Sequence, residues 1–149
     1  MKVYSQKFRI RWSHVDAAGI VYHPQYFVIL NGLMEDFFRD VVGVSYRESI
    51  ASGMGYPIVQ ASAEFPRPSK VDDEVTLHLW IEHLGQTSMG FGMSIVGEDG
   101  VRVLAKETCV YVQRVDGDRM QKHALPDAVR TICEAYLATE AEVEAFHRQ

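Results

Sequence analysis

Cysteine and long apolar runs are both scarce in this chain of 149 residues. Cys109 and Cys133 are the only thiols and form no CxxC pair, which favours a reducing compartment and gives no zinc-binding pattern. The longest apolar runs, such as 26–30, fall far short of the roughly 20 residues that a membrane-spanning helix needs. These absences exclude a disulfide scaffold and a membrane-spanning helix.

Basic residues are also in the minority. Fifteen Lys and Arg against 20 Asp and Glu give a formal net charge of −5 at pH 7. Because duplex binding relies on clustered cations that neutralise phosphates, nucleic acid is disfavoured as the main partner. The opening MKVYSQKFRI lacks the apolar segment and cleavage site of a secretory signal. We therefore expect a cytoplasmic protein.

The composition that remains is that of a globular domain, with 47% hydrophobic and 23% charged residues. The length is close to the commonest size for one domain, so we expect a single domain over residues 1–149. Residues 7–13 alternate, with Phe8, Ile10 and Trp12 on one face, which predicts a half-buried first strand.

A long buried helix is predicted over residues 24–42. Apolar residues recur there at spacings of three and four, Pro24 suits the first helical position, and Gly43 suits the end. The apolar spacing continues on both sides of Gly32, and we interpret this glycine as a point of close packing. The glycine costs the helix about 1 kcal/mol relative to alanine.

After the helix the period changes to two. Four more strands are predicted, over residues 56–65, 74–83, 89–95 and 101–112, and the GEDG sequence at 97–100 predicts a hairpin turn. Leu125-Pro126-Asp127 opens a C-terminal helix. The expected fold is α+β: an antiparallel five-stranded sheet curled around one long buried helix, plus a C-terminal helix. Its sheet edges could be closed by pairing between subunits.

The stretch from Trp12 to Phe27, WSHVDAAGIVYHPQYF, places Asp16 and His23 on either side of a small glycine-containing turn. It resembles the signature of the 4-hydroxybenzoyl-CoA thioesterase family, including the Tol–Pal-associated acyl-CoA thioesterases. The motif matches at Asp16, at His23 and at the glycine, apolar, proline and tyrosine positions between and after them, and the order of elements fits nearly the whole chain.

The resemblance implies a hot-dog fold and an acyl-CoA thioesterase that hydrolyses a short-chain or aromatic acyl-CoA. It also implies a homodimer or a dimer-of-dimers tetramer with the site between two subunits, Asp16 as the catalytic carboxylate, and a role for His23. No cofactor is implied, because coenzyme A is part of the substrate. The acyl group stays open among aromatic, short aliphatic and branched acids.

Thioester hydrolysis itself needs a nucleophile or an activated water, and donors at the carbonyl oxygen. Asp16 could attack the carbonyl or act as general base on water, and both routes stay open. It could also simply cap a turn. The start of the helix offers free amides, and the N–H of His23 is the candidate donor, since Pro24 has none. The His23 side chain could orient substrate, transfer a proton or play a structural part.

Coenzyme A carries phosphates, which call for cations at the mouth of the site. Arg67, Ser69 and Lys70 in the FPRPSK segment are the candidates for phosphate contact, with solvated loop charges as the alternative. The histidines show no metal-ligand spacing, so no metal is expected. A hot-dog hydratase or dehydratase and a non-catalytic acyl-CoA-binding module are the alternative functions.

Overall fold

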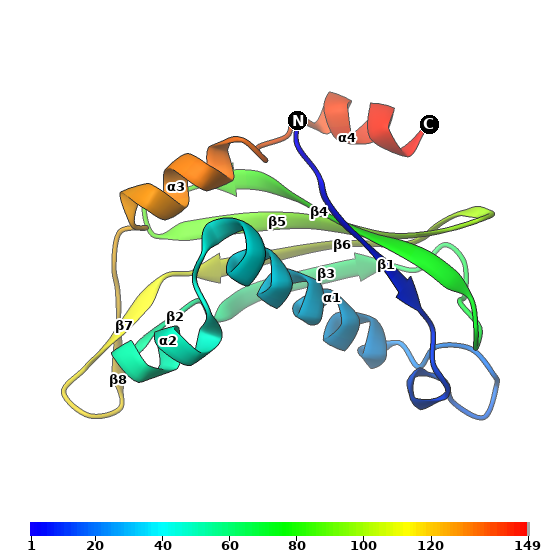
Figure 1. The fold of residues 1–149 in the computed structure, drawn as a ribbon, viewed down its shortest axis with the longest axis horizontal. Helices are drawn as coiled ribbons and strands as arrows, with labels where there is room; N and C mark the ends of the chain where they lie inside the picture. The colour runs from blue at the N-terminus through cyan, green and yellow to red at the C-terminus, as the bar shows by residue number, and fades with distance from the viewer. Residues whose placement is uncertain (149) are drawn as a thin grey trace.

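The structure, a computed structural model, describes residues 1–148 (Figure 1). Its strands are β1 (Tyr4–Arg9), β2 (Met54–Gly55), β3 (Ile58–Glu64), β4 (Glu74–Leu84), β5 (Ser88–Gly97), β6 (Gly100–Val110), β7 (Val112–Val115) and β8 (Arg119–Lys122). Its helices are α1 (Pro24–Phe37), which continues as a π-helical turn (Phe38–Val42), α2 (Tyr46–Ser52), α3 (Asp127–Glu134) and α4 (Glu140–His147), with a 3-10 turn at Trp12–His14.

The main sheet has five antiparallel strands in the order β1-β4-β5-β6-β3. The five-stranded antiparallel sheet predicted from the alternation is therefore confirmed. Because β1 and β3 lie at opposite edges of the sheet, the connection between them carries α1 across one face of the sheet, as Figure 1 shows. The strands β1 and β3 are left at the two edges.

The first strand begins and ends earlier than predicted, and the expected burial of Trp12 is wrong. The strand covers Tyr4–Arg9, Ile10 is fully buried, and the Trp12 side chain is 82% exposed. The N–H of Arg11 donates to His14 Nδ1 at 2.9 Å, and this 3-10 turn redirects the chain before Trp12 can continue the alternation. The period-two spacing of Trp12 does not indicate that such a turn precedes it.

Helix α1 packs one side against the concave face of the sheet. Leu30, Leu33 and Phe37 on that side are almost completely buried. The π-helical turn carries the helix to Val42, and Gly43 ends it with φ +79°, so the predicted helix over 24–42 is confirmed. The close-packing interpretation of Gly32 is wrong for the single chain, since Gly32 is exposed and an added Cβ would meet no atom within 4 Å.

The core lies between this helix and the concave face. Met89, Phe91 and Met93 of β5 are completely buried there, as the strand pattern predicted. Phe38 packs edge-on to Phe91 with ring centroids 6.0 Å apart. On the convex face, Trp80 of β4 is also buried, although alternation placed it outward, because α4 covers it. The alternation within β4 alone could not predict that a helix covers Trp80.

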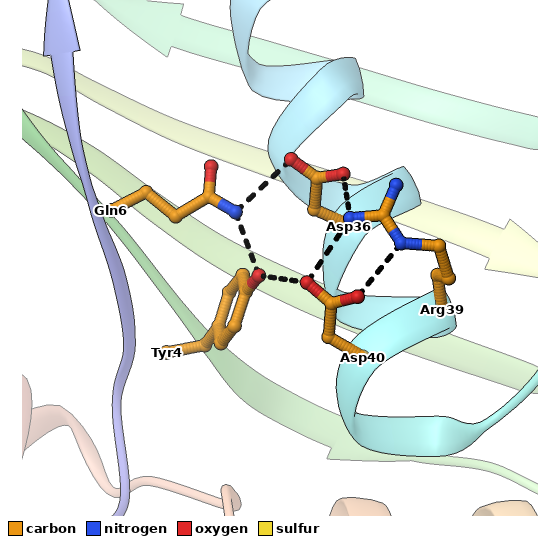
Figure 2. Close-up of polar contacts among 5 residues, drawn as sticks. All are labelled: Tyr4, Gln6, Asp36, Arg39 and Asp40. Carbon is orange, nitrogen blue, oxygen red and sulfur yellow. Dashed lines mark hydrogen bonds and ion pairs between the residues drawn. The ribbon is translucent and has the colours of Figure 1, made fainter.

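A polar network ties the end of α1 to the edge strand β1 (Figure 2). Gln6 Nε2 donates to Tyr4 Oη at 2.7 Å and to Asp36 Oδ2 at 3.0 Å. Tyr4 Oη donates to Asp40 Oδ2 at 3.2 Å, and Arg39 forms ion pairs of 2.7 Å with both Asp36 and Asp40. The network holds the helix and the strand at a defined separation.

The C-terminal region contains two helices instead of the single one predicted. Helix α3 buries Val129 and Cys133 against the core, and the segment after it pairs with the part of β4 that β1 leaves free, through Ile81 N–H to Tyr136 O at 2.9 Å. Thr139 then caps α4, accepting from the Glu142 N–H. Helix α4 has no fully buried residue. Within residues 1–148, no helix is long and apolar enough to cross a membrane.

The predicted strand over 101–112 is two strands. β6 ends at Val110, and the chain then leaves the main sheet to form a second, three-stranded sheet in the order β2-β7-β8. The hairpin between β7 and β8 turns through Asp116 and Gly117, both with positive φ. Asp-Gly is a strong signal for such a turn, so the sequence contained a feature from which this sheet could have been predicted.

Candidate active site

The loop that leads into α1 is folded around Asp16. The Gly19 N–H donates to Asp16 O at 3.0 Å, and the Asp16 N–H donates to Ile20 O at 3.1 Å. Gly19 has φ +76°, a backbone conformation that favours glycine. Val15 and Val21 form an isolated antiparallel bridge that closes the loop. Gly19 and the small residues of the motif therefore allow the tight loop that surrounds Asp16.

The two oxygens of the Asp16 carboxylate have different surroundings. Its Oδ1 accepts a hydrogen bond of 2.8 Å from the Ala18 N–H, which is the turn-capping arrangement. No group in residues 1–148 donates to its Oδ2, and the residue is exposed in the single chain. The turn fixes the direction of the carboxylate while one oxygen is left for a substrate or water. The capping bond is thus compatible with a chemical role for Asp16, which stays a prediction.

His23 sits at the N-terminus of α1 with helical φ and ψ of −52° and −35°. Pro24 follows without an N–H, and the Gln25 N–H already donates to Tyr22 O at 2.8 Å. Among the described residues, no acceptor receives the His23 N–H. The free amide at the start of the helix is therefore that of His23, at the positive end of the helix dipole. Its imidazole is exposed and has no hydrogen bond to residues 1–148.

The second predicted segment lies against the first. The Val21 N–H donates to Ser69 O at 2.9 Å, and Ile20 forms a bridge with Lys70. The Ser69 N–H donates to the hydroxyl of Tyr26 in α1 at 3.1 Å. In Figure 1 the β3–β4 connection and the loop before α1 accordingly meet at one end of the molecule. All five residues predicted for the site belong to these two segments.

The three residues proposed for phosphate contact are not equivalent. Arg67 and Lys70 are exposed, whereas Ser69 is completely buried and its hydroxyl has no partner within the described chain. The Arg67 guanidinium lies over Gly100 in the β5–β6 turn, where an added Cβ would be 2.8 Å from Nη1. The single chain thus presents two cations at this end, while the Ser69 hydroxyl faces the interior.

An aromatic wall beside His23 was missed by the sequence reasoning. Phe65, which follows β3, stacks on Tyr26 with centroids 5.5 Å apart and lies 6.3 Å from the His23 ring. Phe65 is 42% exposed. The sequence reasoning took only the charges of the FPRPSK segment into account. Phe65 directly precedes Pro66, which favours an extended backbone at Phe65, but the sequence does not indicate that its ring packs beside His23.

His14 lies in the same loop, two residues before Asp16. The structure gives it a place in the loop: its Nδ1 accepts from Arg11, its carbonyl accepts from the Tyr22 N–H at 3.0 Å, and its ring packs 5.5 Å from Phe8. Burial, and then the charge of Arg11, lower the pKa of His14 below its usual value. Neutral His14 therefore stabilises the loop that carries Asp16.

Two further observations concern a metal site and a cavity in the described part of the chain. Residues 1–148 contain no group of three or more His, Cys, Asp or Glu placed to bind a metal ion. A cavity of about 930 Å³ lies elsewhere, between α4 and the convex face of the sheet, and contains none of the five predicted site residues. The chemistry available at the loop is therefore that of a carboxylate, an imidazole, a free amide and two cations.

The sequence profile of the thioesterase-like superfamily matches residues 10–132. The chain belongs to this superfamily. The acyl-CoA thioester hydrolase YbgC of Escherichia coli O157:H7 is 26% identical over 121 residues, which are 81% of this chain and 88% of that protein. Among solved structures, the gentisyl-coenzyme A thioesterase BH1999 has a TM-score of 0.76 and 27% identity, covering 88% of this chain and 98% of that one.

A 4-hydroxybenzoyl-CoA thioesterase, solved as an Asp-to-Asn mutant in complex with 4-hydroxybenzoyl-CoA, has a TM-score of 0.77 and 23% identity, covering 89% of this chain and 99% of that one. These similarities confirm that this chain has the hot-dog fold that the motif implied.

Proposed function

We propose that the protein is an acyl-CoA thioesterase, hydrolysing the thioester of a short-chain or aromatic acyl-CoA to the free acid and coenzyme A. The observation that carries the proposal is that one loop holds the Asp16 carboxylate in a fixed turn and leads into a helix whose first N–H, that of His23, is free to donate. The Ala18 N–H donates to one oxygen of Asp16, and within residues 1–148 the other oxygen has no donor and the His23 N–H has no acceptor. Membership of the superfamily and the similarity to YbgC and to gentisyl-coenzyme A thioesterase support the same activity.

In this proposal the His23 N–H donates to the thioester oxygen as negative charge develops on it. Asp16 either attacks the carbonyl carbon, giving an anhydride that water then hydrolyses, or removes a proton from an attacking water. Coenzyme A thiolate leaves in both routes and takes up a proton. The exposed cations Arg67 and Lys70 would meet its phosphates, while buried Ser69 would support the loop through its backbone.

We further propose that the active form is a homodimer, with a dimer of dimers as the tetrameric alternative. Within residues 1–148, no strand pairs with the outer side of edge strand β3, and Val59 on it is 59% exposed. On helix α1, Val28 is 64% exposed, and an added Cβ at Gly32 would meet no atom within 4 Å. An unpaired edge strand beside exposed apolar residues is an arrangement that a second copy can cover. The partner would also supply the wall that the exposed Asp16 loop lacks.

The function is tested with the Asp16→Asn variant and a panel of aromatic, short aliphatic and branched acyl-CoA esters, by measuring release of free thiol. The wild type should hydrolyse at least one ester, and the variant should lose at least about 100-fold in kcat, as expected when a general base is removed. Asn retains the acceptor oxygen for the Ala18 N–H, so the loop should keep its conformation.

The matched control is Asp118→Asn, an exposed aspartate in the turn between β7 and β8, which should leave the rate unchanged. Full activity in Asp16→Asn would contradict the role of Asp16. Failure of the wild type on the whole panel would contradict the thioesterase function. Hydration of an enoyl-CoA without thiol release would instead select the hydratase, and tight binding without turnover would select the binding module.

A further inference from the structure

Arg102 lies near the start of β6, beside the turn that joins this strand to β5. The pairing of the two strands passes over it: Val101 pairs with Val96 and Val103 pairs with Ile95, so Arg102 is the extra residue of a β-bulge. A bulge redirects the side chain of its extra residue out of the regular alternation. The side chain of Arg102 is only 11% exposed. The strand thus departs from regular pairing at a nearly buried cation.

The guanidinium group of Arg102 joins the β5–β6 turn to the connection between β3 and β4. Its Nε donates to Asp99 Oδ1 in the turn at 2.8 Å, and its Nη2 lies 2.6 Å from the same oxygen. Its Nη1 donates to Asp73 Oδ2 at 3.1 Å and to the carbonyl oxygen of Pro68, both in the connection. All three nitrogens, and with them the positive charge, are therefore engaged within the chain.

The two acceptors in the connection lie on either side of Ser69 and Lys70 in the sequence. Asp73 Oδ2 also accepts from the Lys70 N–H at 2.9 Å, so one carboxylate oxygen receives both Arg102 and the backbone of a residue proposed for phosphate contact. Within residues 1–148, neither Arg67 nor Lys70 forms an ion pair. Arg102 thus holds the backbone of this segment, while the two cations on it are available to a ligand.

The glycines at the two ends of the β5–β6 turn leave space for two arginine side chains. A Cβ added to Gly97 would be 2.7 Å from Arg102 Nε, and one added to Gly100 would be 2.8 Å from Arg67 Nη1. Cβ atoms essentially never approach another heavy atom this closely, so a side chain at either position would displace the arginine beside it. The GEDG turn therefore accommodates both Arg102 and one of the two available cations.

We infer that Arg102 is a positioning residue for coenzyme A: it holds the segment 67–70 so that Arg67 and Lys70 meet the phosphates, and it does not contact the substrate itself. The inference rests on the proposed thioesterase function. A segment that is ordered in advance binds its ligand without the cost of immobilising its side chains. Arginine suits this task because its planar fork bonds several acceptors at fixed angles, which the single ammonium group of lysine does not.

The chemical step should not depend on Arg102. The turn around Asp16 is closed by its own hydrogen bonds, from the Ala18 N–H to the carboxylate and from the Gly19 N–H to the carbonyl oxygen. None of these atoms contacts the Arg102 guanidinium. Loss of Arg102 should therefore weaken binding of the coenzyme A portion and leave the reaction of bound substrate intact, which raises KM without lowering kcat.

The experiment measures kcat and KM for an acyl-CoA ester that the wild type hydrolyses, and the Kd of free coenzyme A by titration calorimetry. In Arg102→Gln, KM and Kd should rise about 10-fold, as expected when two cationic side chains must be ordered on binding, while kcat is unchanged. Arg102→Lys should behave like Arg102→Gln, because it keeps the charge and loses the fork. Gly97→Ala keeps every charge, displaces the guanidinium, and should change KM and Kd in the same direction.

A second comparison separates positioning from direct contact. In a protein that already carries Arg67→Gln and Lys70→Gln, adding Arg102→Gln should weaken coenzyme A binding little further, because residues that act through one another are not additive. Lys106→Gln is the matched control: it removes one positive charge from the same strand, where Lys106 pairs with Glu82 at 3.0 Å, and should leave KM, Kd and kcat unchanged.

Wild-type affinity in Arg102→Lys alongside weak binding in Arg102→Gln would show direct contact with phosphate, and so would a fully additive loss in the combined variant. A lower kcat and urea midpoint at unchanged KM would show a purely structural role. Each of these results, or unchanged affinity in all three single variants of Arg102 and Gly97, overturns the inference while thioesterase activity stands. Absence of any hydrolysis by the wild type overturns the proposed function itself, and the Kd of coenzyme A distinguishes the two failures.

Discussion

Two histidines meet on the convex face of the sheet, where α4 packs. His78 of β4 hydrogen bonds with Ser5 Oγ at 2.8 Å and packs edge-on to Phe146, while His147 Nε2 lies 3.0 Å from Ser94 Oγ. Burial, then the charges of His147 and Lys7, lower the pKa of His78 to about 4. Burial also lowers the pKa of His147. Both histidines are therefore neutral in the folded protein around neutral pH.

This titration predicts a loss of stability in acid. The unfolded chain protonates His78 near pH 6.5, whereas the folded chain does so only near pH 4. Below pH 6.5 the unfolded state binds more protons, so the free energy of unfolding should fall as the pH drops from about 6.5 to about 4. In His78→Gln the urea midpoint should decrease less between pH 7 and pH 5 than it does in the wild type.

His83→Gln serves as the control for this prediction, because His83 is an exposed histidine of the same strand. It should retain the wild-type pH dependence. An identical decrease in the wild type and in His78→Gln would show that other groups account for the acid sensitivity.

At the scale of elements, a polar network attaches α1 to β1, in addition to the apolar packing of the helix on the sheet. It is made of side-chain hydrogen bonds at the end of the helix away from Asp16 (Figure 2). The other end is held by the Ser69 N–H to Tyr26 Oη bond. Because helix and loop are continuous, displacement of the helix would move the His23 amide relative to Asp16. The network therefore contributes to the site at a distance.

Gln6→Ala removes two hydrogen bonds of that network at once, to Tyr4 and to Asp36. A net contribution of about 1 kcal/mol per hydrogen bond predicts a loss of about 1–2 kcal/mol in the free energy of unfolding. The comparison is Arg9→Ala, at a residue on the same strand as Gln6. It breaks the exposed ion pair of Arg9 with Glu74 of β4 and should cost under about 0.5 kcal/mol. Equal losses in urea denaturation would contradict the importance of the network.

At the scale of the molecule, we expect the outer edge of β3 to mediate the proposed assembly. A mass of twice the 16.9 kDa of the chain, or four times for the tetramer, is expected from light scattering after size exclusion. Val59→Lys places a charge on the exposed edge and should shift the protein towards the monomer. It should also lower thioesterase activity, because the Asp16 loop would lose its second wall. Gln121→Lys, on exposed strand β8, is the control.

A monomeric wild type with full activity would contradict the proposed dimer. A Val59→Lys variant that remains dimeric and active would show that a different surface mediates assembly.

The sequence alone determined those features that depend on neighbours along the chain. Alternation over 74–83 and 89–95, spacings of three and four over 24–42, and the Pro24 and Gly43 signals act within a few residues, so the sheet, the helix and its limits were predictable. The Asp16 turn is also local, which is why the motif could be recognised from one short stretch.

Tertiary structure alone decided the rest, because it brings together residues that are far apart in sequence. The register between β3 and β6 places Glu107 opposite Ala61, 46 positions away, and nothing near either residue indicates the pairing. The return of the C-terminal chain as α4 buries Trp80 on a face that alternation had assigned to solvent. Burial and hydrogen-bond satisfaction are properties of such distant contacts, and the local pattern therefore could not contain them.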